Sequence, residues 1–288
     1  AGLRHQAKNG IVKYDAAHMD AKAQLKAIDE SVQRVVSLQY TYLHRVLDSL
    51  EEEGLYFLHP EELDVKTKTW LRHYFEEQIY PVVTPLAVDS GHPFPFFANH
   101  TINTIVRIFQ VQSDGTKDYK IAILPIPSVL DRIIEVPTPS NKTHHFVYLE
   151  DVINFYAIQF FQGYGIEESM TFRLTRDADL EIAEEDTKDL LTEVEASLRR
   201  RRRGDAVRLE VVGEGSPELL STVLKSVELE KKDVYHIDGH LDCRMYFDFS
   251  NYPGYDHLRY KPFEPKIPSD LIGSEGENLP DVIRNRDI

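Results

Sequence analysis

The feature that most limits the possible folds is a long amphipathic segment near the start of the chain. Within residues 15–53, aliphatic side chains recur at steps of three and four residues, the periodicity of one helical face. These side chains are Leu25, Ile28, Val32, Val35, Val36, Leu43, Val46, Leu47 and Leu50. Such a helix spans about 55 Å, more than one small core can cover. We therefore expect partner helices along its length.

A second helix is predicted over residues 67–79, and Pro81 ends it. Its large apolar side chains share one face: Trp70, Leu71, Tyr74, Phe75 and Ile79. We expect the two helices to form an antiparallel hairpin with one side left apolar. Because the chain begins at Ala1 without an initiator Met, we also expect a preceding helix to cover that side.

The composition changes after Pro85, where prolines and β-branched residues replace the helical pattern. Residues 102–109 and 119–124 predict a hairpin that turns near Gly115. Further strands are predicted at 145–148, 171–175, 207–212 and 233–237, and helices at 127–134, 149–161, 184–203 and from Pro217 to about Lys225. Short strands interleaved with helices predict an α+β fold, in which a mixed α/β region follows the N-terminal hairpin or bundle.

From Asn251 onward, four prolines predict an extended linker that ends in one short helical stretch at 279–287. The chain stops at Ile288, directly after that stretch, and we expect a further domain to follow. Three regions result: 1–84, which is helical, 85–250, which is α+β, and 251–288, which is a proline-rich linker.

The balance of charge limits what the chain can bind. The sequence has 33 Lys and Arg against 48 Asp and Glu, a formal net charge of -15. This charge disfavours binding to nucleic acid or to an anionic membrane over most of the surface, but it allows a local basic patch. No apolar run reaches the roughly 18 residues of a membrane-spanning helix. The single cysteine, Cys243, excludes an internal disulfide and a thiolate zinc cluster, and it fits a reducing compartment.

Motif searches give no complete catalytic site. The sequence contains neither of the glycine-rich phosphate loops, G-x-x-x-x-G-K-[ST] and G-x-G-x-x-G. It also lacks the G-x-S-x-G turn of serine hydrolases and the H-E-x-x-H motif of zinc proteases. Nothing in these patterns predicts phosphoryl or acyl transfer by this chain alone.

The most visible charge run is Arg199–Arg203. Guanidinium groups suit phosphate oxygens, so the run could form a polyanion site. It also suits the cationic last turn of a helix whose first turn is acidic, and we favour this structural interpretation. Five consecutive side chains point around the helix, and at most two or three can face one ligand.

Metal binding was weighed at the histidines and at an acidic cluster. His236 and His240 lie four residues apart, but Gly239 between them predicts a strand and a turn, where such residues need not converge. His92 precedes a proline and is interpreted as a turn residue. The acidic residues between 177 and 186 lack the glycine and terminal glutamate of a calcium loop. We predict no metal site on this chain.

Several stretches together resemble one family. They are Tyr80–Asp89 continuing through His92–Phe96, Phe172–Asp179, the Arg199–Arg203 run with Gly204–Glu210, Asp233–Tyr235 with Asp238 and Gly239, and Ile283–Ile288. Their order and residues are similar to those of the bacterial polyphosphate kinases of type 1, over essentially the whole chain. His240 departs from the pattern, because the family usually has proline there.

The resemblance implies a parent enzyme that transfers the terminal phosphoryl group of ATP reversibly onto polyphosphate, through a phosphohistidine and with Mg²⁺. It also implies that the adenine-contacting helical segment lies upstream of Ala1. The phosphorylated histidine and the arginines that hold magnesium and phosphate would lie downstream of Ile288. No catalytic or metal-binding residue can then be assigned here, and we expect this chain to bind no cofactor alone.

In terms of the resemblance, residues 1–84 correspond to part of the helical N-terminal domain and residues 85–250 to the head domain. Residues 251–288 lead into a catalytic domain. The family's head domain implies a homodimer and a part in shaping the active-site tunnel. The implied location is the cytoplasm, with peripheral attachment at the inner membrane face as the alternative. We expect no integral membrane segment and no nucleic-acid partner.

Two functional hypotheses remain. In the first, the chain folds but does not catalyse, and it serves dimerisation and tunnel shaping in a polyphosphate kinase. The alternative is a standalone module for self-association or polyanion binding, without enzymatic activity. The candidate phosphate contacts are Arg176, Arg202 and Arg208.

Overall fold

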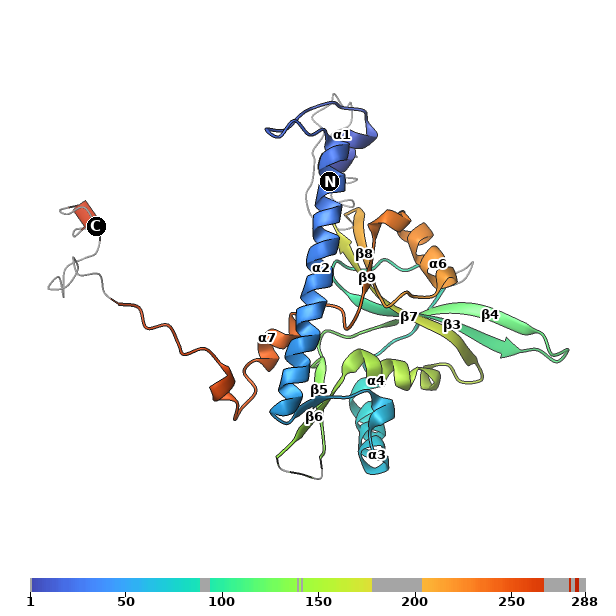
Figure 1. Ribbon diagram of the computed structural model, residues 1–288. Coiled ribbons are helices and arrows are strands. Elements are labelled where there is room, and N and C mark those ends of the chain that lie inside the picture. Colours follow the sequence, from blue (N-terminus) through green and yellow to red (C-terminus); the bar gives the residue numbers. More distant parts are fainter. Residues whose placement is uncertain are drawn as a thin grey trace. The chain divides into compact units, whose positions relative to one another are not determined.

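The structure is a computed structural model that describes residues 2–88, 94–138, 140, 142–177, 204–266, 280, 283 and 284 (Figure 1). The chain divides into two compact units, Ala1–Met245 and Tyr246–Ile288. The predicted helix at 184–203, with its arginine run, lies outside the described residues. None of the described helices is both long enough and apolar enough to cross a bilayer.

The long N-terminal helix is confirmed as α2 (Ala21–Glu52). It begins at residue 21 and not 15, because the Asp20 carboxylate accepts the N–H of Ala23 and caps the first turn. It ends before Gly54, whose φ of +85° suits the turn that follows. Val36 and Tyr40 are buried on the face of α2 that packs against the core of the first unit.

The expected antiparallel helical hairpin is not confirmed. Helix α2 contacts α1 (Gly2–Lys8), β1 (Leu55–Phe57) and β9 (Val234–Ile237). Helix α3 (Val65–Tyr74) lies against β5 (Ile133–Val136) and continues into η2 (Phe75–Ile79), a π-helical turn. Strands therefore cover part of α2 where we expected helices. Ile28, Val35 and Tyr42 on α2 remain half-exposed or more.

A small three-stranded sheet has the order β1-β6-β5. Strand β6 (His144–Tyr148) pairs parallel with β1 and antiparallel with β5. The prediction of a helix at 127–134 was wrong. Pro127 suggested a helix start, but Ile133 and Ile134 are β-branched and pair with Tyr148 and Val147 on β6.

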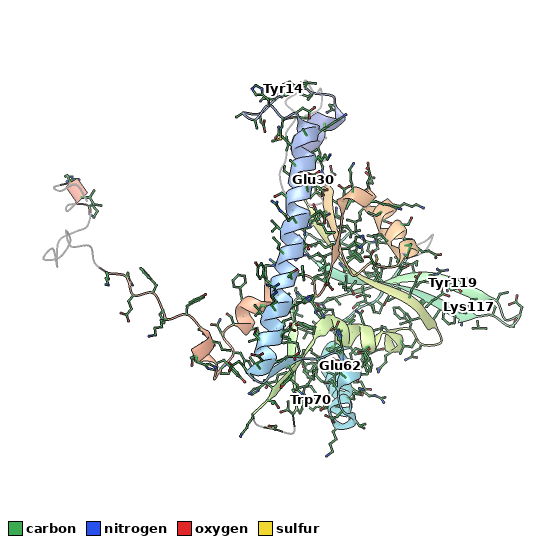
Figure 2. All side chains as sticks on the ribbon, viewed as in Figure 1. Tyr14, Glu30, Glu62, Trp70, Lys117 and Tyr119 are labelled. Carbon is green, nitrogen blue, oxygen red and sulfur yellow. The ribbon has the colours of Figure 1, made fainter. Side chains whose placement is uncertain are left out.

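The larger sheet has six strands in the order β2-β4-β3-β7-β8-β9. The bounds are β2 (Leu86–Val88), β3 (Ile102–Val111), β4 (Lys117–Pro125), β7 (Gly165–Arg176) and β8 (Ala206–Val212). The β3–β4 hairpin is confirmed as antiparallel and extends beyond its neighbours, with Lys117 and Tyr119 along its outer part (Figures 1 and 2). Strands β8 and β9 are parallel, joined by α6 (Pro217–Val227), so the sheet is mixed.

Both faces of the larger sheet are covered. Ile105 and Val106 are adjacent on β3 and both are fully buried, because successive side chains of a strand point to opposite faces. Ile105 belongs to a cluster that includes Leu219 of α6. Val106 belongs to a second cluster shared with Leu71 of α3 and Ile153 of α4 (Leu149–Phe155). Residues on both sides of position 84 share this second cluster, and the domain boundary predicted there stays a prediction.

The described part of the second unit contains little regular structure. It includes the end of α7 (Met245–Phe249) and the short 3₁₀ turn η5 (Asp256–Leu258). The Arg259 guanidinium donates to the carbonyls of Ser250 and Tyr252, at 2.8 and 2.9 Å, and closes a local loop. Tyr260 is fully exposed. Residues 260–266 belong to no helix or strand, and the linker predicted from the prolines stays a prediction.

Candidate functional site

A cavity of about 420 Å³ lies within the first unit. Its walls come from α2, β1, the residue just before the turn η1 (Pro60–Glu62), β6, α4, β7, β8 and the turn after β9. The polar side chains that line it include Glu51, Glu150, Asp151 and Asp238 together with His44, His59 and His240. Among the described lining residues there is no Lys or Arg. Carboxylates repel phosphate, and no Lys or Arg among these described residues offsets their charge, so this cavity does not suit a polyphosphate chain.

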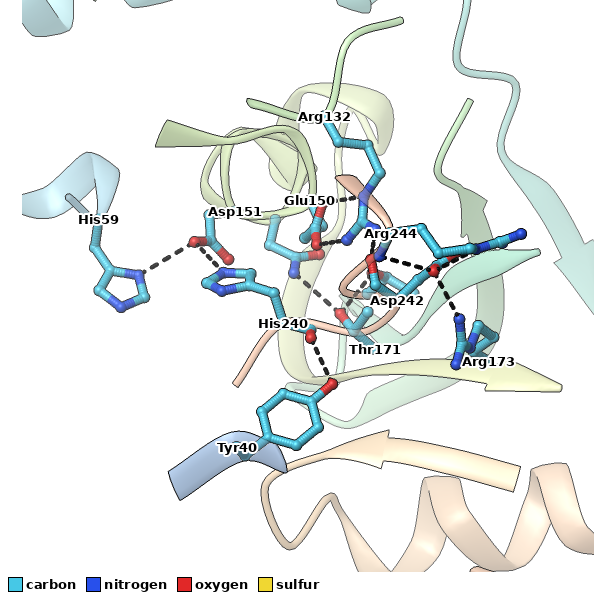
Figure 3. A network of polar contacts seen from close by, with 12 residues as sticks. Tyr40, His59, Arg132, Glu150, Asp151, Thr171, Arg173, His240, Asp242 and Arg244 are labelled. Atoms are coloured by element: carbon cyan, nitrogen blue, oxygen red, sulfur yellow. Dashed lines mark hydrogen bonds and ion pairs between the residues drawn. The ribbon is translucent and has the colours of Figure 1, made fainter. Parts of the chain in front are cut away.

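One carboxylate in the lining of this cavity, that of Asp151, contacts two histidine rings. Asp151 lies in the first turn of α4, and its Oδ2 contacts Nε2 of His240 at 2.8 Å and Nδ1 of His59 at 3.3 Å (Figure 3). The Tyr148 ring stacks on His240, with the ring centroids 3.6 Å apart, and the Tyr40 hydroxyl donates to the His240 carbonyl at 2.8 Å. The tyrosine contacts fix the His240 imidazole against Asp151, whose Oδ2 also contacts the more exposed His59 ring.

The surroundings shift the pKa of two of these groups. Burial by itself would raise the pKa of Asp151, but hydrogen bonds and charge from His240 and His59 outweigh it and lower the pKa to about 2. The hydrogen bond to Asp151 raises the pKa of His59 above 6.5, against the opposing effect of burial. The arrangement favours a carboxylate anion next to a protonated imidazole.

A second buried polar group includes Glu150 and Thr171, which also line the cavity. Glu150 is 3% exposed and accepts from the Arg132 guanidinium, which also donates to the carbonyl of Asp242 at 3.1 Å. The Asn154 amide of α4 donates to the Thr171 hydroxyl of β7 at 3.2 Å, and Thr171 in turn pairs with the Thr104 hydroxyl of β3 at 2.9 Å. These contacts satisfy buried polar atoms and tie α4 to the larger sheet.

A third group connects β7 with β8. The Arg173 Nε donates to Glu210, which also accepts from Arg208 at 2.7 Å. The Arg173 Nη1 lies 3.3 Å from Asp242, and Arg244 also contacts that carboxylate. Glu210 is 4% exposed, so its charge is stabilised by the two guanidinium groups and not by water.

Of the predicted phosphate contacts, Arg176 and Arg208 take separate positions outside the cavity. The Arg176 Nε donates to the Phe97 carbonyl at 2.7 Å and its Nη1 to the Gly204 carbonyl at 2.9 Å. Arg208 contacts Glu210 and lies over the Tyr235 ring, 4.1 Å from its centroid. Arg202 lies outside the described residues. As phosphate contacts, all three remain predictions.

The histidines considered as a metal pair do not converge. The His236 Nδ1 lies 3.0 Å from the Gly213 carbonyl, whereas His240 contacts Asp151. Within the part of the chain that the structure describes, no group of three or more His, Cys, Asp or Glu side chains could hold a metal ion. The residues described here therefore do not fit a Mg²⁺ site, and we derive no chemical step through one.

Sequence reasoning missed the contact between His59, Asp151 and His240. His240 was singled out for its spacing from His236 and for standing where the family usually has proline, but its actual partner lies 89 positions away in the chain. Asp151 and His59 are single polar residues within otherwise ordinary segments. No local pattern marks them, because only the packing of β1, α4 and the turn after β9 brings them together.

The comparisons with known proteins agree on one family. A family model described as the polyphosphate kinase middle domain matches residues 66–249. The polyphosphate kinase of Halalkalibacterium halodurans is 39% identical over 293 residues, which cover 100% of this chain and 41% of the relative. That of Pseudomonas syringae pv. tomato is 34% identical over 290 residues, covering 100% of this chain and 39% of the relative.

The fold has a counterpart among solved structures. A crystal structure of polyphosphate kinase from Porphyromonas gingivalis superposes with a TM-score of 0.70 at 22% identity. The match covers 98% of this chain and 38% of that one, and supports the fold alone. This chain therefore spans about two fifths of the length of the relatives that it matches. Because the middle-domain model matches more than half of its residues, the chain belongs to the polyphosphate kinase family.

Proposed function

We propose that this chain forms the N-terminal and head region of a polyphosphate kinase. The full-length enzyme would transfer the γ-phosphoryl group of ATP reversibly to polyphosphate through a phosphohistidine, with Mg²⁺ and ATP bound by other parts of the protein. The observation that carries this proposal is the middle-domain match over residues 66–249, together with coverage of about two fifths of each relative. In this proposal the protein works in the cytoplasm, where ATP is available.

We propose further that this region does not itself catalyse phosphoryl transfer. A transferring phosphoryl group needs positioned cations around its oxygens. The described lining of the cavity instead carries four carboxylates and no Lys or Arg. His240 and His59 face Asp151, and an anionic neighbour disfavours the approach of a nucleotide phosphate.

Labelling with [γ-³²P]ATP and Mg²⁺ tests the absence of catalysis. The chain is incubated with the nucleotide and the reaction is quenched. The label that remains on the protein is then compared after acid and after alkaline treatment, because phosphohistidine is stable only in alkali. We expect no label on the chain, while a full-length relative assayed in parallel becomes labelled. Acid-labile label that disappears when one histidine of this chain is replaced, as in His240→Asn, would refute this part of the proposal.

The role we propose for this region is self-association and shaping of the approach to the active site. Sedimentation equilibrium with and without polyphosphate tests it. We expect a dimer whose dissociation constant does not change when polyphosphate is added. Association only in the presence of polyphosphate would favour the alternative, a polyanion-binding module. In that case, replacing Arg176 or Arg208 by Gln should reduce the salt dependence of binding by about one unit of slope each.

A further inference from the structure

Ionisable contacts connect the residues before position 66 with the matched middle domain. His59 lies between β1 and η1, before the matched region, whereas Asp151 and His240 both lie inside it. A second, longer contact joins His44 of α2 to Asp238, with 3.9 Å between Nδ1 and Oδ2. Two histidines that precede residue 66 thus contact carboxylates within the matched region 66–249, and both pairs line the same cavity.

Asp151 depends on its two imidazoles for stabilisation. Its side chain is 18% exposed and that of His240 is 19% exposed, whereas that of His59 is 64% exposed. Water therefore reaches His59 easily but Asp151 poorly, and the contact from His59 replaces part of the hydration that the carboxylate has lost. His240 is also fixed by Tyr148 and Tyr40, so His59 is the less constrained of the two partners.

The other charges near His59 are mainly negative. Glu61 and Glu62 lie on its own turn, and both favour its protonated form. On the facing side, α4 contributes Asp151, and Glu150, whose charge is compensated by Arg132. The remaining ionisable groups of the cavity are Glu51 and His44 of α2, Asp238, and the His240 ring, whose centroid is 6.2 Å from that of His59. Of these groups, Asp151, Glu62 and Glu61 favour the protonated form of the His59 imidazole.

We propose that His59, Asp151 and His240 form a pH-dependent clasp that fastens β1 and η1 onto α4. When His59 is protonated, its Nδ1–H donates to the anionic Asp151 Oδ2 and the clasp is tight. When His59 loses its proton, the attraction between opposite charges is lost and the segment 55–62 opens more often. The clasp does not depend on the proposed function, because it concerns only the attachment of this segment to the rest of the first unit.

The direction of the effect follows from the two pKa values. Asp151 is ionised at every pH well above about 2. The pKa of His59 is raised above 6.5, so its contribution is complete below the unfolded value and is lost as the pH rises through the folded value. The clasp is therefore fully formed in mildly acidic solution and weakens as the pH rises beyond 6.5 through the raised pKa of His59.

Hydrogen exchange measured by mass spectrometry tests the clasp in the full chain. Amide protection of residues 55–62 is measured at about pH 5.5 and about pH 8.5 and corrected for the intrinsic pH dependence of exchange. We expect protection to be about two- to fivefold lower at the higher pH, the range for a partly exposed ion pair. Protection of β3 and β7 should not change.

Two variants separate the clasp from other effects of pH. His59→Gln should show the lower protection at both pH values, so that the pH dependence of segment 55–62 disappears. His73→Gln is the matched control, because His73 is an exposed histidine that lies 3.2 Å from a carboxylate, Glu77, on the neighbouring turn. It should keep the wild-type pH dependence.

A proton NMR titration of the His59 ring gives an independent measurement. In Asp151→Asn the midpoint should fall towards 6.5, and if that variant does not fold, the exchange data on His59→Gln decide the question. The proposal is wrong if segment 55–62 has equal protection at both pH values, or if His59→Gln keeps the wild-type pH dependence.

Discussion

Replacing Glu210 by Ala tests how far a buried ion pair supports the sheet. Glu210 is 4% exposed on β8 and accepts from Arg173 on β7 and from Arg208 on its own strand. Removing one partner of a buried pair costs about 3–5 kcal/mol, because the charge that remains is poorly solvated. Arg173 would retain Asp242 at 3.3 Å, and Arg208 would retain the Tyr235 ring. We therefore expect the lower end of that range, about 3 kcal/mol.

The loss of stability in Glu210→Ala can be measured by circular dichroism as a shift of the midpoint of thermal unfolding. For a unit of this size, about 3 kcal/mol corresponds to a decrease of about 6–12 °C. The control is Glu214→Ala, in the exposed turn after β8, which should change stability by less than about 0.5 kcal/mol. The double variant Arg173→Met with Glu210→Leu should recover most of the loss, since apolar residues of similar volume can replace a buried pair.

A small loss of stability in Glu210→Ala would contradict this prediction. If Glu210→Ala has a native spectrum and loses less than about 1 kcal/mol, the charge is not held by the contacts described here. A double variant that is less stable than either single variant would show that packing, and not charge, determines the stability at this site.

Two further predictions concern the backbone and acid stability. In Gly54→Ala a Cβ would lie 2.9 Å from the Lys142 carbonyl oxygen at a φ of +85°, so we expect a loss of about 1–3 kcal/mol by urea unfolding. Gly115 has a similar φ of +83° but open space around it, so Gly115→Ala should lose less stability. Equal losses of stability in the two variants would contradict the steric argument. Burial opposes ionisation of Asp242, but Arg244 and Arg173 lower its pKa to about 2. Its contribution is thus complete above about 3.8 and lost as the pH falls through about 2. Asp242→Asn should flatten the acid unfolding curve in this range, and an unchanged curve would count against the ion pair.

The local elements could be predicted well from the sequence. The predicted hairpin at 102–124 corresponds to β3 and β4, and the helix that starts at Pro217 corresponds to α6. Ser216 marks that start, because its side chain accepts the N–H of Leu219. Side-chain periodicity, caps and turns act over a few residues, so they can be read without knowledge of the fold.

Pairings between distant segments could not be predicted in this way. Strand β1 has three residues and forms only because His144–Phe146 lie beside it in parallel. The first two residues of β5 were assigned to the predicted helix 127–134, because the extended conformation is favoured by the partner strand β6 and not by the local sequence. Short strands gain most of their stability from neighbouring strands, and the local sequence does not identify which strands those are.

The sequence by itself determined the long amphipathic helix, the mixed succession of strands and helices, and the family, because each rests on residue order along the chain. Only the tertiary structure decided which carboxylate each basic side chain faces. Arg176 and Arg208 looked available for phosphate, yet their guanidinium groups contact carbonyls, a carboxylate and aromatic rings of this chain. Asp151 meets His59 and His240 across about 90 residues on either side, because burial leaves a charged group stable only where packing supplies its partners.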